Sequence, residues 1–356
     1  MGPTAGPGWR RVAAALALVT VTGCAGTATG PERDLRGAGA GGSRSPAAGD
    51  HTHAPGTEDG HGHDHDAVTV SDTLPRWEPV EGLYVPRDDF ATAVVDGRIW
   101  AMGGMTGERG NRLTSIEVLD TATGRWSTSD VELPVGLASF EAVATGPRIW
   151  AFGGFDAASV PTDFAAVLDT RTGRWKDLPP LPHPRYAHTV TLHDGKIYVV
   201  GGRDQDGPVS AVDVFDPVRR TWTTADVPMP SARDSHDAVS TPDGLLVVGG
   251  WLGDGPTDRV DLYDPATGEW TAAPSLPVPM SRAGVAVADG RVWVSLHTTS
   301  YVLDVDERRS WEPANAISLS RHGLGYVLVD DALYAIGGCA ENPLRDVRTV
   351  DRLTLA

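Results

Sequence analysis

Residues 184–222 read PRYAHTVTLHDGKIYVVGGRDQDGPVSAVDVFDPVRRTW. Two apolar runs flank the pair Asp194-Gly195, and the second run ends in Gly201-Gly202. A third run ends at Asp216, six residues before Trp222. An Asp-Gly pair between apolar runs is a strong signal for a tight hairpin, because such turns need positive φ. The stretch therefore predicts a small antiparallel sheet of short strands.

The same pattern recurs along the chain at steps of 41 to 49 residues, measured from tryptophan to tryptophan. The tryptophans are Trp77, Trp126, Trp175, Trp222, Trp270 and Trp311. The glycine pairs are Gly103-Gly104, Gly153-Gly154, Gly201-Gly202, Gly249-Gly250 and Gly337-Gly338. Four short strands in a unit of this length are typical of a propeller blade.

Diglycine, aspartate and tryptophan in a constant register resemble the kelch repeat, from Ser71 to Ala356. The resemblance implies an all-β fold, a six-bladed kelch β-propeller of the galactose oxidase/kelch superfamily. One unit departs from the pattern, because the glycine pair is missing around Trp293 to His297. The sequence therefore does not predict the structure of the loop between the second and third strands of that unit.

The termini indicate how the ring closes. Trp77 precedes every glycine pair, whereas Gly337-Gly338 is followed by a third apolar run and no tryptophan. We expect the segment from Arg76 to Glu78 to supply the fourth strand of the final blade, which leaves no open edge between the first and last blades. Residues 71–356 then form one domain of six blades.

The first 23 residues have the pattern of a secretory signal. Arg10-Arg11 precedes an apolar run, Val12 to Val21, that is too short to span a bilayer. The ending Val-Thr-Gly-Cys resembles a bacterial lipobox, which implies that Cys24 carries a lipid. We therefore expect an exported lipoprotein on the extracytoplasmic face of a bacterial membrane, attached by its lipid anchor only.

Residues 24–70 are rich in glycine, alanine and histidine, which predicts a disordered tether. Its five clustered histidines have two interpretations, a Zn²⁺, Cu²⁺ or Ni²⁺ site or a solvated low-complexity segment. They are His51, His53, His61, His63 and His65. We expect no required cofactor elsewhere in the chain.

The formal net charge is −17 at pH 7, which argues against nucleic acid as a partner. The sequence contains no HExxH, GxSxG, phosphate-binding or dinucleotide-binding motif. This favours a non-enzymatic role and leaves the question of catalysis open. We expect a monomer.

One face of the propeller is expected to collect the residues before each first strand and after each second strand. Guanidinium groups and aromatic rings suit an anionic or sugar ligand, or alternatively the arginines serve only the repeat architecture. The candidates are Arg87, Asp88, Asp89, Phe155, Arg185, Tyr186, Arg203, Arg233, Asp234, Trp251, Arg282, Arg321 and His322. His188 and His236 occupy equivalent positions and are interpreted as repeat residues.

The sequence thus predicts a lipid-anchored binding module that holds a protein or glycan partner at the cell envelope. A carbohydrate-active enzyme is the first alternative, similar to the six-bladed kelch mutarotase that acts on sialic acid or, with less support, to galactose oxidase. Capture of metal ions by the histidine-rich tether is the second.

Overall fold

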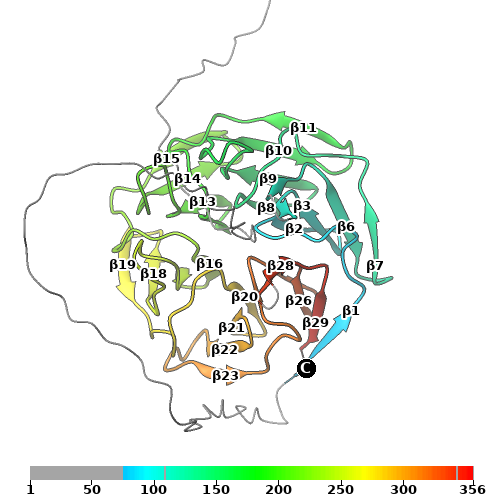
Figure 1. Cartoon of the computed structure of the whole chain (residues 1–356). Coiled ribbons are helices and arrows are strands. Elements are labelled where there is room, and N and C mark those ends of the chain that lie inside the picture. The colour runs from blue at the N-terminus through cyan, green and yellow to red at the C-terminus, as the bar shows by residue number, and fades with distance from the viewer. Residues whose placement is uncertain (1–74, 108–109, 342–343, 356) are drawn as a thin grey trace, which may run out of the picture.

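The computed structural model describes residues 75–107, 110–341 and 344–355. In these residues the chain is all-β and contains six four-stranded antiparallel sheets, arranged in a ring (Figure 1). The described residues include no helix of the length and apolar character needed to cross a membrane. The signal, the tether, Cys24 and the five tether histidines lie outside the described residues.

The first three sheets follow the chain from the innermost to the outermost strand. The first sheet contains β2 (Ala91–Val95), β3 (Arg98–Met102), β6 (Ile116–Asp120) and β7 (Arg125–Thr128). The second contains β8 (Glu141–Thr145), β9 (Arg148–Phe152), β10 (Ala165–Asp169) and β11 (Arg174–Asp177). The third contains β12 (Thr189–His193), β13 (Lys196–Val200), β14 (Val212–Asp216) and β15 (Thr221–Thr224).

The last sheet combines the two ends of the described chain. The fourth sheet contains β16 (Asp237–Thr241), β17 (Gly244–Val248), β18 (Val260–Asp264) and β19 (Glu269–Ala272). The fifth contains β20 (Gly284–Ala288), β21 (Arg291–Leu296), β22 (Thr299–Asp304) and β23 (Glu312–Ala314). The sixth contains β25 (Gly325–Val329), β26 (Ala332–Ile336), β29 (Val350–Thr354) and β1 (Trp77–Val80).

Short strands pair in the loops that follow two of the glycine pairs. They are β4 (Met105–Thr106) with β5 (Asn111–Arg112), and β27 (Cys339–Glu341) with β24 (Arg321–His322) and β28 (Leu344–Asp346). The fifth sheet, which lacks the glycine pair, has no such loop, because β21 and β22 are joined directly by a turn at His297. This settles the loop that the sequence left open.

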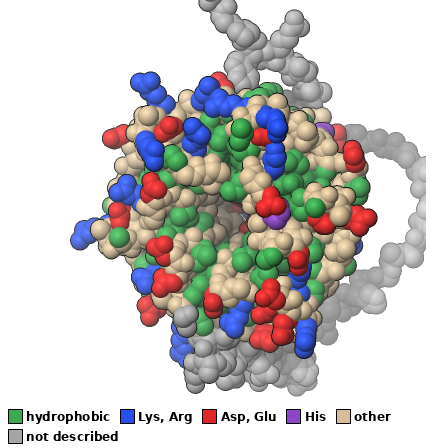
Figure 2. Space-filling model, turned by 180° about the vertical axis from the view of Figure 1, so that it is seen from behind, with side chains coloured by type: hydrophobic (Ala, Val, Ile, Leu, Met, Phe, Trp, Pro, Cys, Tyr) green, Lys and Arg blue, Asp and Glu red, His purple; other side chains and the backbone are tan. Residues whose placement is uncertain are grey.

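The innermost strands form a closed circle. β2, β8, β12, β16, β20 and β25 contact one another in this order, and β25 contacts β2 again. Figure 2 shows the resulting hollow at the centre of the molecule. The apolar cores lie between neighbouring sheets, as where Ala151 and Leu168 of the second sheet pack with Met102 and Ile116 of the first.

The closing strand predicted from the tryptophan count is present. β1 pairs antiparallel with β29, and Trp77 lies opposite Leu353. The Trp77 ring is buried and packs at 5.8 Å from the ring of Tyr326. The first strand in the described chain is therefore the outermost strand of the last sheet.

The six tryptophans share one hydrogen bond. Each indole N–H donates to a backbone carbonyl of the loop that leads into its own sheet, at 2.8 to 3.3 Å. The acceptors are Asn315, Glu81, Glu132, Pro179, Val227 and Pro274, for Trp77, Trp126, Trp175, Trp222, Trp270 and Trp311 respectively. The repeat tryptophan thus fixes the crossing from one sheet to the next.

We expect Trp77→Ala to lower the free energy of unfolding by about 3–5 kcal/mol, because it removes a buried aromatic side chain from the closing strand. Trp77→Phe keeps most of the apolar ring but loses the hydrogen bond to the Asn315 carbonyl. The loss of that hydrogen bond alone should lower the free energy of unfolding by about 1 kcal/mol. Urea unfolding of both variants measures the difference. A Trp77→Ala chain as stable as the parent would show that β1 does not close the ring.

Candidate functional site

Four of the predicted ligand-binding arginines are fully buried. Arg87, Arg185, Arg233 and Arg321 have no exposed side-chain surface. Each guanidinium pairs with a buried carboxylate on the third strand of its own sheet. The pairs are Arg87–Glu117, Arg233–Asp261 and Arg321–Asp351, each at 2.8 Å, and Arg185–Asp213.

Two of these guanidinium groups also bond the first glycine of a pair. Nη1 of Arg87 donates to the carbonyls of Gly103 and Ser115, both at 3.0 Å. Nη1 of Arg185 donates to the equivalent carbonyls of Gly201 and Ala211, both at 3.1 Å. Burial lowers the pKa of these arginines, and the facing carboxylate acts in the opposite direction.

Two sheets lack the arginine, and both also lack the acid. In the second sheet Leu137 stands at the arginine position, and Ala166 stands where the other sheets have the carboxylate. In the fifth sheet the two residues are Met280 and Tyr301. A buried charge without its partner is costly, which explains why both are replaced together. The structure therefore favours the architectural alternative for these four arginines.

We expect Arg321→Leu to cost about 3–5 kcal/mol, since it leaves Asp351 as an uncompensated buried charge. The double variant Arg321→Leu/Asp351→Ala reproduces the Leu137/Ala166 combination of the second sheet and should recover most of that loss. Chemical denaturation of the single and double variants provides the measurement. If the double variant is as unstable as the single one, the ion pair is not the reason for the loss.

A closed ring of six backbone hydrogen bonds surrounds the mouth of the channel, two residues beyond the arginine position. Each residue has φ between 48° and 61°, and its N–H donates to the equivalent residue of the preceding sheet at 2.7 to 3.4 Å. In chain order the six are Asp89, Ser139, Ala187, Ser235, Arg282 and Gly323, and the N–H of Asp89 donates to Gly323 to close the circle. We call this the mouth ring.

Each glycine pair reaches across to the next sheet just outside the mouth ring. The N–H of Gly104 donates to the carbonyl of Leu137 at 2.8 Å, and the N–H of Gly338 donates to Arg87 at the same distance. Gly104 has φ of +88°, and a Cβ added there would lie 2.5 Å from the carbonyl oxygen of Asp88. The second glycine is therefore required by both its conformation and the close backbone approach.

Arg282, also one of the predicted ligand-binding residues, does not belong with the four buried arginines. The mouth ring puts Met280 at the arginine position and Arg282 at the position of Asp89. The side chain of Arg282 is about a quarter exposed, and its Nη1 lies 3.6 Å from the carboxylate of Asp89. That carboxylate raises the pKa of Arg282, against the effect of burial.

Two further arginines from other sheets are accessible on the same side. Nε of Arg203 donates to the carboxylate of Asp234 at 2.8 Å, and the Arg203 side chain is 23% exposed. The guanidinium of Arg112, which the sequence did not single out, lies 4.3 Å from the centre of the Phe155 ring. The Phe155 ring in turn meets Tyr186 edge-on at 5.0 Å.

The residue that follows each glycine pair forms a β-bridge with the residue that follows the arginine position. The two groups of loop residues therefore lie on one face, as expected from the sequence. The bridges are Met105 with Asp88, Phe155 with Ala138, Arg203 with Tyr186, Trp251 with Asp234, and Cys339 with His322. Phe155 and Tyr186 are buried, whereas Trp251 and His322 are partly exposed. The accessible part of the predicted set is therefore smaller than the sequence suggested.

Carboxylates that the sequence did not single out line the channel below the mouth ring. Asp237 accepts hydrogen bonds from the Thr189 hydroxyl and the Val285 N–H, both at 3.1 Å. Burial raises the pKa of Asp237 to about 6 and raises that of Glu141 well above its usual value. The sequence did contain a signal for these carboxylates, because each is a charged residue at the first position of an innermost strand. The other four innermost strands begin with uncharged residues, namely Ala91, Thr189, Gly284 and Gly325.

His188 and His236 are repeat residues, as interpreted from the sequence. They stand where the first two sheets have Phe90 and Phe140, and Nε2 of His236 bonds the Val200 carbonyl at 3.0 Å. Burial, with the neighbouring arginine, lowers the pKa of each histidine to about 3. Both rings are therefore neutral packing groups at physiological pH.

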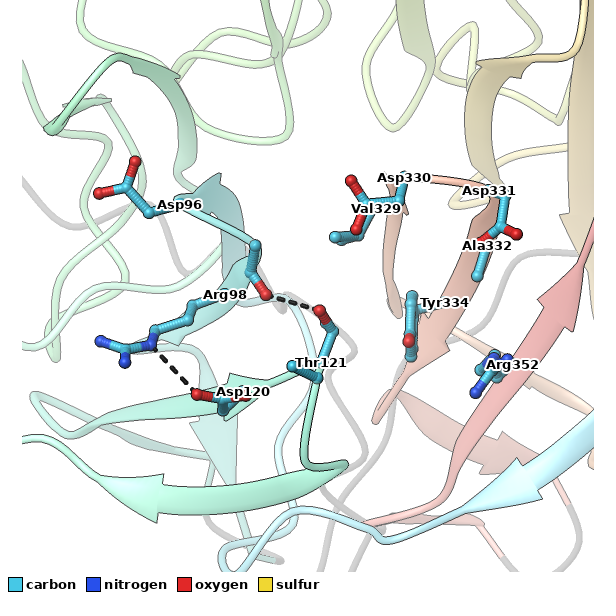
Figure 3. Close-up of a pocket in the computed structure, with 12 residues that line it drawn as sticks. Asp96, Arg98, Asp120, Thr121, Val329, Asp330, Asp331, Ala332, Tyr334 and Arg352 are labelled. Atoms are coloured by element: carbon cyan, nitrogen blue, oxygen red, sulfur yellow. Dashed lines mark hydrogen bonds and ion pairs between the residues drawn. The ribbon is translucent and has the colours of Figure 1, made fainter.

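The opposite side of the ring carries a cleft of about 300 Å³ between the first and sixth sheets (Figure 3). It is lined by the turns at Asp96 and Asp330, and by Tyr334 and Arg352. Arg98 and Asp120 also line the cleft, and they form an ion pair in which Nε of Arg98 lies 3.5 Å from Oδ2 of Asp120. Sequence reasoning did not identify this cleft, because it forms between the two ends of the chain.

Comparison with known proteins agrees with this architecture. The KLHDC2/KLHL20/DRC7 Kelch-repeats domain family matches residues 89–295, more than half of the chain. An F-box/kelch-repeat protein of Arabidopsis thaliana is 35% identical over 108 residues, which are 27% of this chain and 26% of that protein. Kelch-like protein terF of Aspergillus terreus is 29% identical over 162 residues, 41% of this chain and 35% of that protein.

Kelch-like protein 35 of Mus musculus is 30% identical over 160 residues, 44% of this chain and 26% of that protein. The chain spans about a quarter to a third of the length of these eukaryotic relatives. The chain belongs to the KLHDC2/KLHL20/DRC7 Kelch-repeats domain family.

Proposed function

We propose that this kelch-repeat chain is a binding module that holds a protein or glycan partner on its loop face, the side that carries the mouth ring and the loops after the glycine pairs. The observation that carries the proposal is the contrast between two groups of arginines. Four are consumed inside the sheets, whereas Arg112, Arg203 and Arg282 remain partly exposed on three different sheets.

These three groups are well prepared for binding. Arg203 and Arg282 are already oriented by carboxylates, and Arg112 by an aromatic ring, so little side-chain freedom is lost on association. Guanidinium groups bind carboxylates and sugar hydroxyls through several directed hydrogen bonds. The partly exposed Trp251 and the exposed Leu252 add apolar surface beside them. Arginine and tryptophan are also the residue types that most often dominate binding energy at interfaces.

The double variant Arg203→Gln/Arg282→Gln tests the loop face. Glutamine keeps a hydrogen-bond donor for Asp234 and Asp89, so we expect the melting temperature to stay close to that of the parent. Loss of two charge-assisted contacts should weaken binding by about tenfold or more. Binding is measured on a glycan array and by photo-crosslinking in cells from a probe residue placed at Leu252.

The matched control is Arg98→Gln/Arg352→Gln, which changes two arginines at the cleft on the opposite side. It should leave glycan retention and crosslinked products unchanged. Equal retention by the loop-face and control variants would remove the loop face from the function, and loss only in the control would move the site to the cleft.

We further propose that Cys24 anchors the protein by a lipid on the extracytoplasmic face of the membrane, with residues 24–70 as a spacer. The support is the charged, apolar and small-residue order of residues 10–24. The five tether histidines are proposed as a separate site for Zn²⁺, Cu²⁺ or Ni²⁺. The loop-face proposal depends on neither.

Cys24→Ser should move the protein from the membrane fraction to the soluble fraction, because this single residue carries the lipid. The propeller itself should melt at the parent temperature. Mass spectrometry of the mature parent should show an added lipid and an N-terminus at Cys24. Unlipidated Cys24, including Cys24 in a disulfide with Cys339, would contradict the anchor.

A further inference from the structure

Asp88 is a buried carboxylate with an unusual environment. It is 1% exposed, and neither of its carboxylate oxygens has a hydrogen-bond partner among the described residues. Its backbone is fully used, since the N–H donates to Met105 at 3.1 Å and the carbonyl accepts from Met105 at 2.8 Å. Buried carboxylates normally accept several hydrogen bonds, as Asp237 does. The described residues therefore leave the Asp88 carboxylate without the hydrogen bonds that a buried carboxylate normally accepts.

A second carboxylate faces Asp88 from the other end of the chain. Asp346 lies at the end of β28, in the loop of the sixth sheet, and its Oδ2 accepts from the Gly107 N–H at 2.7 Å. Its Oδ1 is buried without a hydrogen-bond partner. One oxygen of Asp88, one of Asp346 and the sulfur of Cys339 lie within 4.8 Å of one another. The two carboxylates are the oxygen donors of this group, and hard cations such as Ca²⁺ prefer oxygen ligands to sulfur.

The nearby cations do not compensate this pair. Arg282 lies against Asp89, and Arg112 lies on Phe155, so both act on Asp88 only at a distance. Asp88 is buried, and both of its oxygens and one oxygen of Asp346 have no hydrogen-bond partner among the described residues. A bound cation would satisfy these oxygens and offset the repulsion between the two carboxylates.

The oxygen-only donor set and its spacing indicate the kind of ion. Ca²⁺ binds oxygen ligands at about 2.3–2.6 Å, so two ligands on opposite sides can be about 5 Å apart. The two oxygens lie within 4.8 Å of each other, which leaves room for such an ion between them. An oxygen-only donor set also disfavours Zn²⁺, which proteins bind mainly through nitrogen and sulfur, and Mg²⁺, which usually keeps several waters.

We propose that Asp88 and Asp346 bind a divalent cation of the calcium class at the seam between the first and sixth sheets. The ion joins the loop entering the first sheet to a loop of the last sheet, at the opposite end of the seam from the Asp96 and Asp330 turns. It therefore adds a second closure to the one made by β1 and β29. With two carboxylates we expect a dissociation constant of about 10⁻⁴–10⁻³ M, the range of extracellular calcium modules.

The test compares the full mature chain after chelation with the same chain in CaCl₂. At a free Ca²⁺ concentration a hundredfold above the dissociation constant, the unfolding equilibrium should shift by about a hundredfold toward the folded state. This appears as a rise in melting temperature of a few degrees. Calorimetric titration should show one site per chain.

Asp88→Asn and Asp346→Asn should each abolish the Ca²⁺-dependent rise, and Asp88→Asn should leave the chelated protein at least as stable as the parent. Asp254→Asn, an exposed aspartate in the equivalent loop of the fourth sheet, is the control and should keep the rise. The proposal is overturned if Ca²⁺ leaves the parent unchanged, if both variants keep the response, or if only Zn²⁺ produces it.

Discussion

The mouth ring is the constraint on which the rest of the structure depends. Six backbone hydrogen bonds join six sheets into a circle, so no sheet can rotate or shift without breaking two of them. Each ring residue has positive φ, and five of the six are not glycine, at a cost of about 1–2 kcal/mol each. Such a conformation persists only when the surroundings enforce it. In most sheets glycine pairs and buried arginines lie beside the ring residues and support them.

The supporting interactions lie in successive layers outward from the channel. The second glycine of each pair donates to the neighbouring sheet, and in the first and third sheets the arginine joins the glycine carbonyl to the third strand. At the outer edge the indole of each tryptophan fixes the loop that returns to the centre. The glycine pairs occur in five sheets, the buried arginines in four and the tryptophans in all six, where Trp77 of the closing strand completes the set. The stability of any one sheet therefore depends on its two neighbours.

Much of this could be predicted from local patterns. Asp-Gly turns, glycine pairs and tryptophan spacing act over a few residues, and counting them located the closing strand. The arginine–carboxylate pairs could not be predicted in the same way, because Arg87 and Glu117 are 30 residues apart and both appear as surface residues in the sequence. The position of Arg282 within its repeat could not be predicted for a similar reason. Only the backbone hydrogen bond to Ser235 shows that it is a ring residue.

The candidate sites follow from the same distinction between repeated and unrepeated residues. A residue present at one position in most sheets serves the scaffold, as Arg185 and its three equivalents do. Arg282 in the mouth ring, and Arg203 and Trp251 after their glycine pairs, occur at positions where the other sheets have different residues. Asp88 has an equivalent in Asp234, but it faces Asp346 at the seam of the first and sixth sheets. Because the scaffold already holds their backbone, these side chains can vary without loss of the fold. The unrepeated residues of the loop face are therefore where a binding specificity particular to this chain can reside.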